Sequence, residues 1–165
     1  MLKENVNKLL KTFGRDVIRE SKKNLIRQKK NVSKRGYKSL AFTTEKYDTH
    51  IDSAFYMEDY MYYQDQGVSG KERKFNTPFS YKDKRPPASA FSSWSVRRGI
   101  APRSEDGRFI PRRSLQFALA THIYKKGIEP SLFFTVPFEK WYKKLVNDLD
   151  KAYGEDIEIM IKEEL

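Results

Sequence analysis

The stretch LKENVNKLLKTFGRDVIRESKKNLIRQKK, residues 2–30, decides how this chain folds. Apolar side chains recur in it at steps of three and four residues, with lysine, arginine, glutamate and asparagine between them. That spacing places the apolar side chains on one side of an α-helix. The apolar positions are Leu2, Val6, Leu9, Leu10, Phe13, Val17 and Leu25. We therefore expect one long amphipathic helix, with Gly14 as its weak point, whose apolar face covers a sheet or another helix.

A β-hairpin is expected soon after this helix. Over residues 38–56 the pattern changes to a period of two, which is typical of strands. Leu40, Phe42 and Thr44 share one side of a first strand, and Ile51 and Phe55 share one side of a second. Residues 45–48 join the two strands in this interpretation. The next stretch, YMEDYMYYQDQ (residues 56–66), fits either a short helix or a strand.

Proline and glycine mark the boundaries of later helices. Pro87 and Pro111 open two segments that end at Gly99 and Gly127, as expected for helices with proline in the first turn and glycine just past the end. The predicted helices span residues 87–98, 111–126 and 137–153. Residues 155–165 fit a helix or a strand by periodicity, and their many acidic residues favour a helix.

These elements predict an α+β fold in a single domain, residues 1–165. A small antiparallel sheet packs against the long N-terminal helix and the C-terminal helices. Residues 67–87, GVSGKERKFNTPFSYKDKRPP, interrupt this pattern with an extended loop or arm. A loop of this length within a compact domain is usually functional or disordered. Because Phe75, Phe79 and Tyr81 are spaced along it, we expect a loop that docks on a partner.

The composition of the chain limits what it can do. It has 165 residues, 33 Lys+Arg against 22 Asp+Glu, a net charge of +11, two histidines and no cysteine. The absence of cysteine excludes disulfides, thiolate metal sites and a cysteine nucleophile. No stretch approaches the roughly 20 apolar residues of a membrane helix, so no membrane partner is expected. The charged N-terminal stretch also argues against a signal peptide.

Motifs of enzymatic chemistry are missing from the sequence. It holds no phosphate-binding G-x-x-x-x-G-K-[ST], no G-x-G-x-x-G, no G-x-S-x-G and no H-E-x-x-H. Glu105 and Asp106 are adjacent and cannot serve as a spaced acid–base pair. His50 and His122 have no second ligand at metal spacing. The sequence therefore predicts a protein that is not an enzyme and carries no cofactor, metal or catalytic residue.

Short motifs in this chain resemble a viral protein family. Residues 60–70 are YMYYQDQGVSG, residues 115–120 are LQFALA and residues 127–134 are GIEPSLFF. In this order they are similar to the head–tail connector and tail-completion (neck ring) proteins of tailed bacteriophages, especially those of crAss-like phages of gut Bacteroidetes. Tyr62, Asp65 and Gly67 match one mark of that family. Pro130, Phe133 and Phe134 match a second, where the family often has Arg-Pro-Phe.

The resemblance implies a structural role in the virion. It implies a subunit of a ring in the neck or tail, assembled in the host cytoplasm, that joins the portal to the tail. The ring would hold roughly twelve copies, or alternatively about six, and contact the portal or an adjacent neck or tail ring. Non-specific contact with packaged DNA is left open, and no cofactor is implied. The alternatives are a basic nucleic-acid-binding module, supported by the charge and the aromatics, and a small enzyme such as a nuclease.

Charge also predicts how copies join. Residues 131–165 carry a net charge of −3, whereas the rest of the chain is strongly positive. We expect an arginine-rich stretch of one copy to meet the acidic end of the next, because arginine binds carboxylates bidentately. The arginines are Arg97, Arg98, Arg103, Arg108, Arg112 and Arg113, and the acidic residues are Glu155, Asp156, Glu158, Glu163 and Glu164. Alternatively, the acidic end simply solvates a C-terminal helix.

Overall fold

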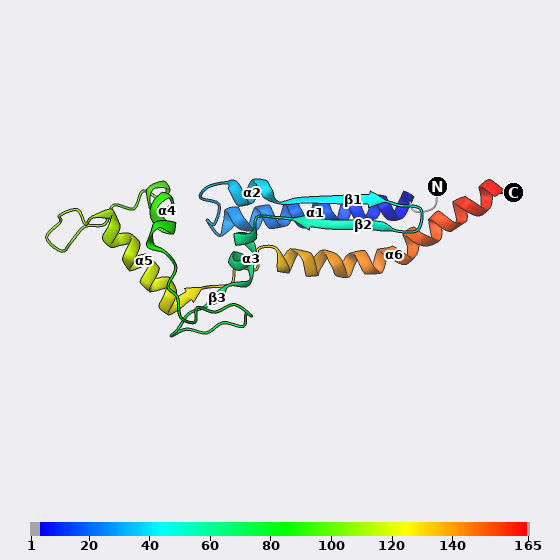
Figure 1. The fold of residues 1–165 in the computed structure, drawn as a ribbon. Coiled ribbons are helices and arrows are strands. Elements are labelled where there is room, and N and C mark those ends of the chain that lie inside the picture. The colour runs from blue at the N-terminus through cyan, green and yellow to red at the C-terminus, as the bar shows by residue number, and fades with distance from the viewer. Residues whose placement is uncertain (1–3, 165) are drawn as a thin grey trace. The chain divides into compact units, whose positions relative to one another are not determined.

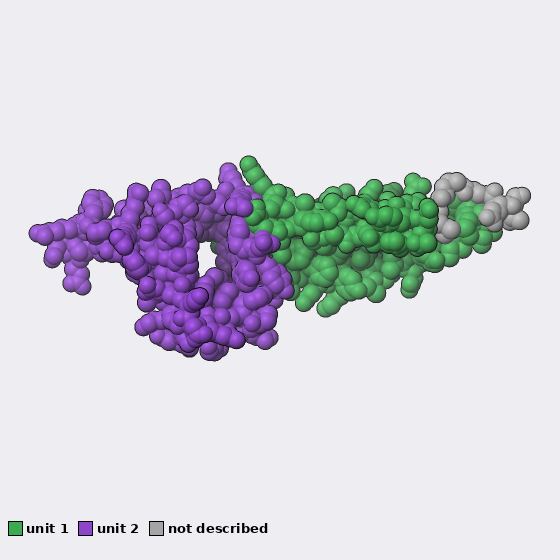
Figure 2. All heavy atoms as spheres, viewed as in Figure 1, with its two compact units in different colours: residues 1–28, 37–58, 133–165 green, residues 29–36, 59–132 purple. Residues whose placement is uncertain are grey.

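The chain forms two compact units, described by a computed structural model over residues 4–164, with side chains over residues 4–162. Unit 1 comprises residues 1–28, 37–58 and 133–165, and unit 2 comprises residues 29–36 and 59–132 (Figure 2). The chain therefore leaves unit 1 twice and returns to it twice. Compact units of this kind can belong to one folding domain, so the expectation of a single domain stays a prediction.

Unit 1 is built on two long helices and a hairpin (Figure 1). Its elements are α1 (Glu4–Arg27), β1 (Ala41–Lys46), β2 (Ile51–Tyr56) and α6 (Thr135–Glu164). The hairpin and α6 both lie alongside α1. β1 and β2 pair in antiparallel register, with Phe42 opposite Phe55. The long amphipathic helix and the hairpin are thus confirmed.

An aromatic cluster forms the core of unit 1. The Phe13 ring of α1 contacts the rings of Phe42, Phe55 and Phe138 edge-on, at centroid distances of 5.7–6.4 Å. Val17 and Leu145 complete the buried cluster. Edge-to-face contacts of this kind stabilise by about 0.5–1.5 kcal/mol beyond the area they bury. The predicted apolar side of the first helix is therefore the core side; Leu2 lies outside the described residues.

Gly14 allows β1 to approach α1 closely. It is buried, and a Cβ atom built on it would lie 2.0 Å from the Phe42 ring. That separation is well inside van der Waals contact, so the ring can pack there only over a glycine. The position that weakens the helix in the sequence is thus the position at which the hairpin docks.

We expect Gly14→Ala and Gly154→Ala to change stability in opposite directions. Alanine favours a helix over glycine by about 1 kcal/mol. At Gly14 the collision with Phe42 outweighs this gain, because overpacking costs about 1–3 kcal/mol. At Gly154, within α6, no atom lies within 4 Å of the added methyl, so the gain remains. Thermal unfolding followed by circular dichroism measures both, and a stabilised Gly14→Ala variant would contradict this packing.

Unit 2 holds shorter elements. They are α3 (Asp59–Gln66), β3 (Val68–Ser69), the 3₁₀ turn η1 (Ala88–Phe91), α4 (Ser92–Arg97), α5 (Arg112–Lys126) and β4 (Gly127–Ile128). β3 and β4 form a second antiparallel pair, which the sequence did not predict. α2 (Arg35–Ser39), at the boundary between the units, was also not predicted. The α+β class is confirmed, with two small sheets in place of one.

Helix boundaries follow the proline and glycine signals in unit 2. Pro111 is the N-cap of α5, and Gly127 ends it with a φ of 78°. The predicted helix over residues 87–98 begins with a 3₁₀ turn, so only residues 92–97 are α-helical. In unit 1, α6 continues through Gly154 to Glu164. Residues 155–164 are therefore helical, which settles the choice left open by the sequence; Leu165 lies outside the described residues.

Glu20 joins α1 to α6. Its carboxylate accepts hydrogen bonds from Lys140 Nζ and from the Trp141 indole N–H, both at 2.8 Å. The bond to Lys140 is the main cause that lowers the pKa of Glu20 below its ordinary 4.5, and Trp141 acts in the same direction. A lowered pKa in the folded state means that the ionised carboxylate stabilises the fold. This stabilisation is present above pH 4.5 and is lost as the pH falls through the folded-state pKa.

We expect Glu20→Gln to reduce the dependence of the unfolding free energy on pH under acidic conditions. The wild-type chain should lose stability below pH 4.5, and the variant should lose less over the same range. Urea unfolding at pH values between about 3 and 6 measures the difference. Glu139→Gln, which changes an exposed glutamate of α6, is the matched control. Parallel profiles for the wild type and Glu20→Gln would show that this link does not contribute.

Candidate functional site

α6 carries exposed apolar side chains beside its contact with α1. Tyr142, Val146, Leu149 and Tyr153 recur at steps of four, three and four residues, so they form one row, here called the α6 stripe. Their exposed fractions lie between 38% and 51%. They flank the side of α6 that packs on α1. A row of this size on a soluble helix is typical of a surface that another protein covers.

The last turns of α6, residues 155–164, form the α6 end. Ile159 and Ile161 are 44% and 52% exposed, and Ile157 and Met160 are half-buried. Alternate isoleucines on a helix point to different sides, so the α6 end is apolar on more than one side. Ile159 and Ile161 are exposed in the single chain, between charged neighbours, and a partner could cover them.

Asp156 has a structural role within this segment. It is 3% exposed, and its carboxylate accepts the backbone N–H groups of Asn5 at 2.8 Å and Val6 at 3.1 Å. These N–H groups belong to the first turn of α1, where a helix has no backbone acceptors of its own. The carboxylate also lies at the positive end of the helix dipole. Asp156 therefore anchors α6 on α1 and does not lie on the surface.

Glu155 and Glu158 are exposed, as expected for partner-binding residues. Glu158 accepts a hydrogen bond from Lys162 at 2.7 Å, which is the main cause that lowers its pKa. Glu155 lies 4.0 Å from Lys151. Both are i,i+4 pairs on the surface, so neither holds its glutamate firmly. The side chains of Glu163 and Glu164 lie outside the described residues.

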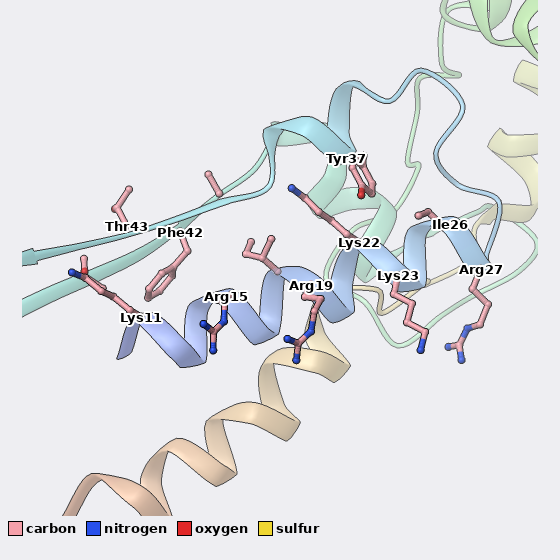
Figure 3. Close-up of a pocket in the computed structure, with 13 residues that line it drawn as sticks. Lys11, Arg15, Arg19, Lys22, Lys23, Ile26, Arg27, Tyr37, Phe42 and Thr43 are labelled. Carbon is pink, nitrogen blue, oxygen red and sulfur yellow. The ribbon is translucent and has the colours of Figure 1, made fainter. Parts of the chain in front are cut away.

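A groove runs between α1 and β1 in unit 1 (Figure 3). Its volume is about 1160 Å³, and its apolar lining residues include Ile18, Ile26 and Phe42. Figure 3 shows Phe42 reaching from β1 toward α1 and the basic side chains leaving α1 along its length. Six cations line the groove: Lys11, Arg15, Arg19, Lys22, Lys23 and Arg27. We call this feature the α1 groove.

The basic row of the α1 groove was missed in the sequence, although its signal is there. Lys11, Arg15, Arg19, Lys23 and Arg27 follow one another at steps of four, so a helix must place them side by side. The apolar positions of this helix predict its core side, and the charged residues between them form the opposite, exposed side. What it could not provide is the hairpin, which supplies the second wall of the groove.

Unit 2 has a cavity of about 1260 Å³, here called the unit 2 cavity. Cations and aromatic rings share its walls. The cations are Lys30, Arg35, Arg97 and Arg98, and the aromatic residues are Tyr60, Tyr63, Phe79, Tyr81, Phe91 and Trp94. Burial lowers the pKa of Lys30, and Glu129 and Asp65 oppose that effect. This mixture of charge and rings is suited to polyanions with flat groups, such as single-stranded nucleic acid.

The loop over residues 67–87 packs on its own unit. Ser69 and Phe79 are joined by a backbone hydrogen bond of 2.8 Å, and the Tyr81 N–H donates to the Ser69 carbonyl at 2.9 Å. Phe79 packs edge-on against Tyr63, and Phe75 lies under the Arg73 guanidinium. Burial also raises the pKa of Tyr81 above 10.0. The loop is therefore folded back and not extended; that these aromatics contact a partner stays a prediction.

The predicted arginines lie at several places in unit 2. Arg97 and Arg98 stand at the end of α4, and both line the unit 2 cavity. Arg103 packs over the Phe109 ring and donates to the Gly107 carbonyl at 3.0 Å. Arg112 and Arg113 begin α5, and Arg108 is exposed in the turn before it. Their pairing with an acidic segment of another copy stays a prediction.

Within residues 4–164, no group of acidic or histidine side chains has the arrangement of a metal site. The helices described over the same range include none that is long and apolar enough to cross a membrane. His50 is exposed in the hairpin, where its ring stacks on Tyr47, and His122 is exposed on α5. The features that remain as candidate sites are the α6 stripe, the α6 end, the α1 groove and the unit 2 cavity.

Comparisons of the chain with protein-family models, with curated proteins and with solved structures found no match. The resemblance to phage neck proteins therefore rests on the motifs in the sequence. Pro130, Phe133 and Phe134, one of those motifs, lead into α6, and Phe133 is fully buried.

Proposed function

We propose that this chain is a structural subunit of a virion neck or tail ring, which joins the portal to the tail through contacts between copies and with adjacent rings. The α6 stripe carries this proposal. Four apolar side chains in one row are exposed in the single chain, and a partner must cover them to remove them from water. A ring supplies such a partner at every position, because each copy has two neighbours.

The function is structural in this proposal, as the resemblance to neck proteins implies, and no catalytic step is assigned to the chain. Such a protein is expected in the neck or tail of the virion, after assembly in the host cytoplasm. Its remaining partners are the portal or an adjacent ring. The resemblance favours roughly twelve copies, with about six as the alternative.

The state of the purified chain tests this proposal. Native mass spectrometry and negative-stain imaging are expected to show a closed ring of one discrete copy number. A chain that stays monomeric at all accessible concentrations would contradict the proposal. Val146→Asp on the α6 stripe is expected to weaken the ring, because it places a carboxylate on a surface that becomes buried.

A second candidate function is non-specific nucleic-acid binding. The observation that favours it is the combination of cations and aromatic rings in the unit 2 cavity. Binding of this kind depends on phosphate contacts and falls steeply with salt. Fluorescence anisotropy with labelled single- and double-stranded DNA over a salt series tests it. A monomer with strong, salt-dependent DNA affinity would favour this function over the ring.

A further inference from the structure

We propose that the α6 end of one copy inserts into the α1 groove of the next copy. This inference rests on the proposed function, since it names the contact that would build the ring. The occupant of the groove is thus a second copy of this chain, and the segment that enters is the part of the α6 end that follows the anchoring residue Asp156. Three observations support the pairing: polarity, charge and length.

The apolar surfaces of the two parts are complementary. The α6 end presents Ile159 and Ile161, both about half exposed, and the α1 groove presents Ile26, which is 58% exposed. Neither set of side chains is covered within the described part of unit 1. A helix end that is apolar on several sides needs walls on several sides. The α1 groove provides two walls, α1 and β1 (Figure 3).

The charges are complementary as well. The residues after Asp156, IEIMIKEE (157–164), hold three acidic residues and one lysine. The α1 groove is lined by six lysine and arginine side chains. Charges at the rim of such a contact orient the partners and exclude like-charged ones, while the apolar part supplies affinity. An acidic helix with exposed isoleucines is therefore the kind of ligand that this groove fits.

The α6 end is also short enough for the α1 groove. The eight helical residues after Asp156 span about 12 Å, at about 1.5 Å per residue. The cations of the α1 groove run from Lys11 to Arg27, which is about 24 Å along α1 by the same measure. The α6 end thus fits within the length of the groove.

The contact must form between copies and not within one chain. α6 is a continuous helix up to Glu164, and Asp156 holds it at the N-terminal end of α1. In unit 1, the α6 end continues past the hairpin and away from the α1 groove (Figure 1). It cannot turn back into its own groove without breaking the helix. A contact that joins one face to a different face of the next copy repeats into a ring or a filament.

A complementation experiment tests the inference with two variants. The first, Ile159→Asp with Ile161→Asp, alters the α6 end and leaves the groove intact. The second, Ile26→Asp, alters the groove and leaves the α6 end intact. All three isoleucines are exposed, so circular dichroism spectra should match the wild type. Val96→Asp, at a 50% exposed position on α4, is the matched control and is expected to assemble like the wild type.

Each variant alone is expected to be monomeric at concentrations where the wild-type chain assembles. The affinity between copies should fall by about 100-fold, because a carboxylate replaces an isoleucine that the contact buries. An equimolar mixture of the two variants is expected to give a heterodimer and nothing larger in native mass spectrometry. Only one intact α6 end and one intact groove meet in that mixture, so growth stops at two copies.

Other results would overturn the inference. If either variant assembles like the wild type, this contact does not build the ring, although the ring itself and the proposed function stand. If the wild-type chain never assembles, the proposed function fails and this inference fails with it. A third result is that the wild-type chain binds DNA where the Ile26→Asp variant does not, while both assemble equally. In that case the occupant of the groove is nucleic acid.

Discussion

Replacing Gly127 by alanine is expected to destabilise unit 2 by about 3–5 kcal/mol. Its φ of 78° and ψ of −169° lie in a region that essentially only glycine occupies, and forcing another residue into it costs about 1–3 kcal/mol. An added Cβ would also lie 2.2 Å from the Val68 carbonyl oxygen and 2.6 Å from the Gly70 nitrogen. These are backbone atoms, so they cannot move aside without parting β3 from β4, which costs a similar amount.

The effect of Gly127→Ala is best measured locally. β3 holds the loop over residues 67–87 through hydrogen bonds of Ser69 with Phe79 and Tyr81. Hydrogen exchange at residues 67–81 should therefore rise sharply, together with a lower unfolding temperature. Gly107→Ala is the matched control, because Gly107 also has a positive φ, 75°, but no atom within 4 Å. Equal effects at Gly107 and Gly127 would show that the collision with Val68 is unimportant.

Replacing Asp156 by alanine is expected to cost about 3 kcal/mol. The change leaves the N–H groups of Asn5 and Val6 without their acceptor in a partly buried place. Hydrogen bonds to a charged group each contribute about 1.5–3 kcal/mol, and the carboxylate also interacts with the dipole of α1. Urea unfolding gives the free energy, and hydrogen exchange over the first two turns of α1 localises the loss.

Two variants sharpen the Asp156 test. Asp156→Asn keeps one oxygen acceptor without the charge, so it should lower the free energy of unfolding by less than Asp156→Ala does. Glu155→Ala removes an exposed neighbour whose closest cation lies 4.0 Å away, and should change stability by less than about 0.5 kcal/mol. If Asp156→Ala behaves like Glu155→Ala, the carboxylate does not anchor the two helices.

Much of the fold could be predicted because local patterns determine it. The spacing of Phe13 and Val17 indicated a helix side, and that side is the core. Alternation around Phe42 and Phe55 indicated two strands, and they pair. By contrast, β3 and β4 have two residues each, and their paired residues Ser69 and Gly127 lie 58 positions apart along the chain, so no periodicity could reveal them. Their pairing depends on where the chain returns after α5.

Predicting the candidate site was harder because the charge of a residue does not show whether its side chain is buried. Asp156 and Glu155 are neighbours with the same charge, yet one caps α1 and the other is exposed. Only the contact between Asp156 of α6 and Val6 of α1, which are 150 positions apart along the chain, distinguishes them. Likewise, the apolar lining of the α1 groove needs Phe42 beside α1. The pattern of the helix by itself does not contain this contact. Sequence patterns thus indicated the elements, and tertiary contacts determined the surfaces.

Unit 1 is made of three segments that are separated along the chain, and this separation affects how it folds during synthesis. α1 is complete by residue 27 and the hairpin by residue 56, but α6 begins only at residue 135. At about 5–20 residues per second, the ribosome needs several seconds or more to make the intervening part. Until then, the side of α1 that later meets Leu145 and Phe138 has no cover from its own chain. Newly made chains are therefore expected to expose this apolar side of α1 during that interval, when aggregation is most favoured.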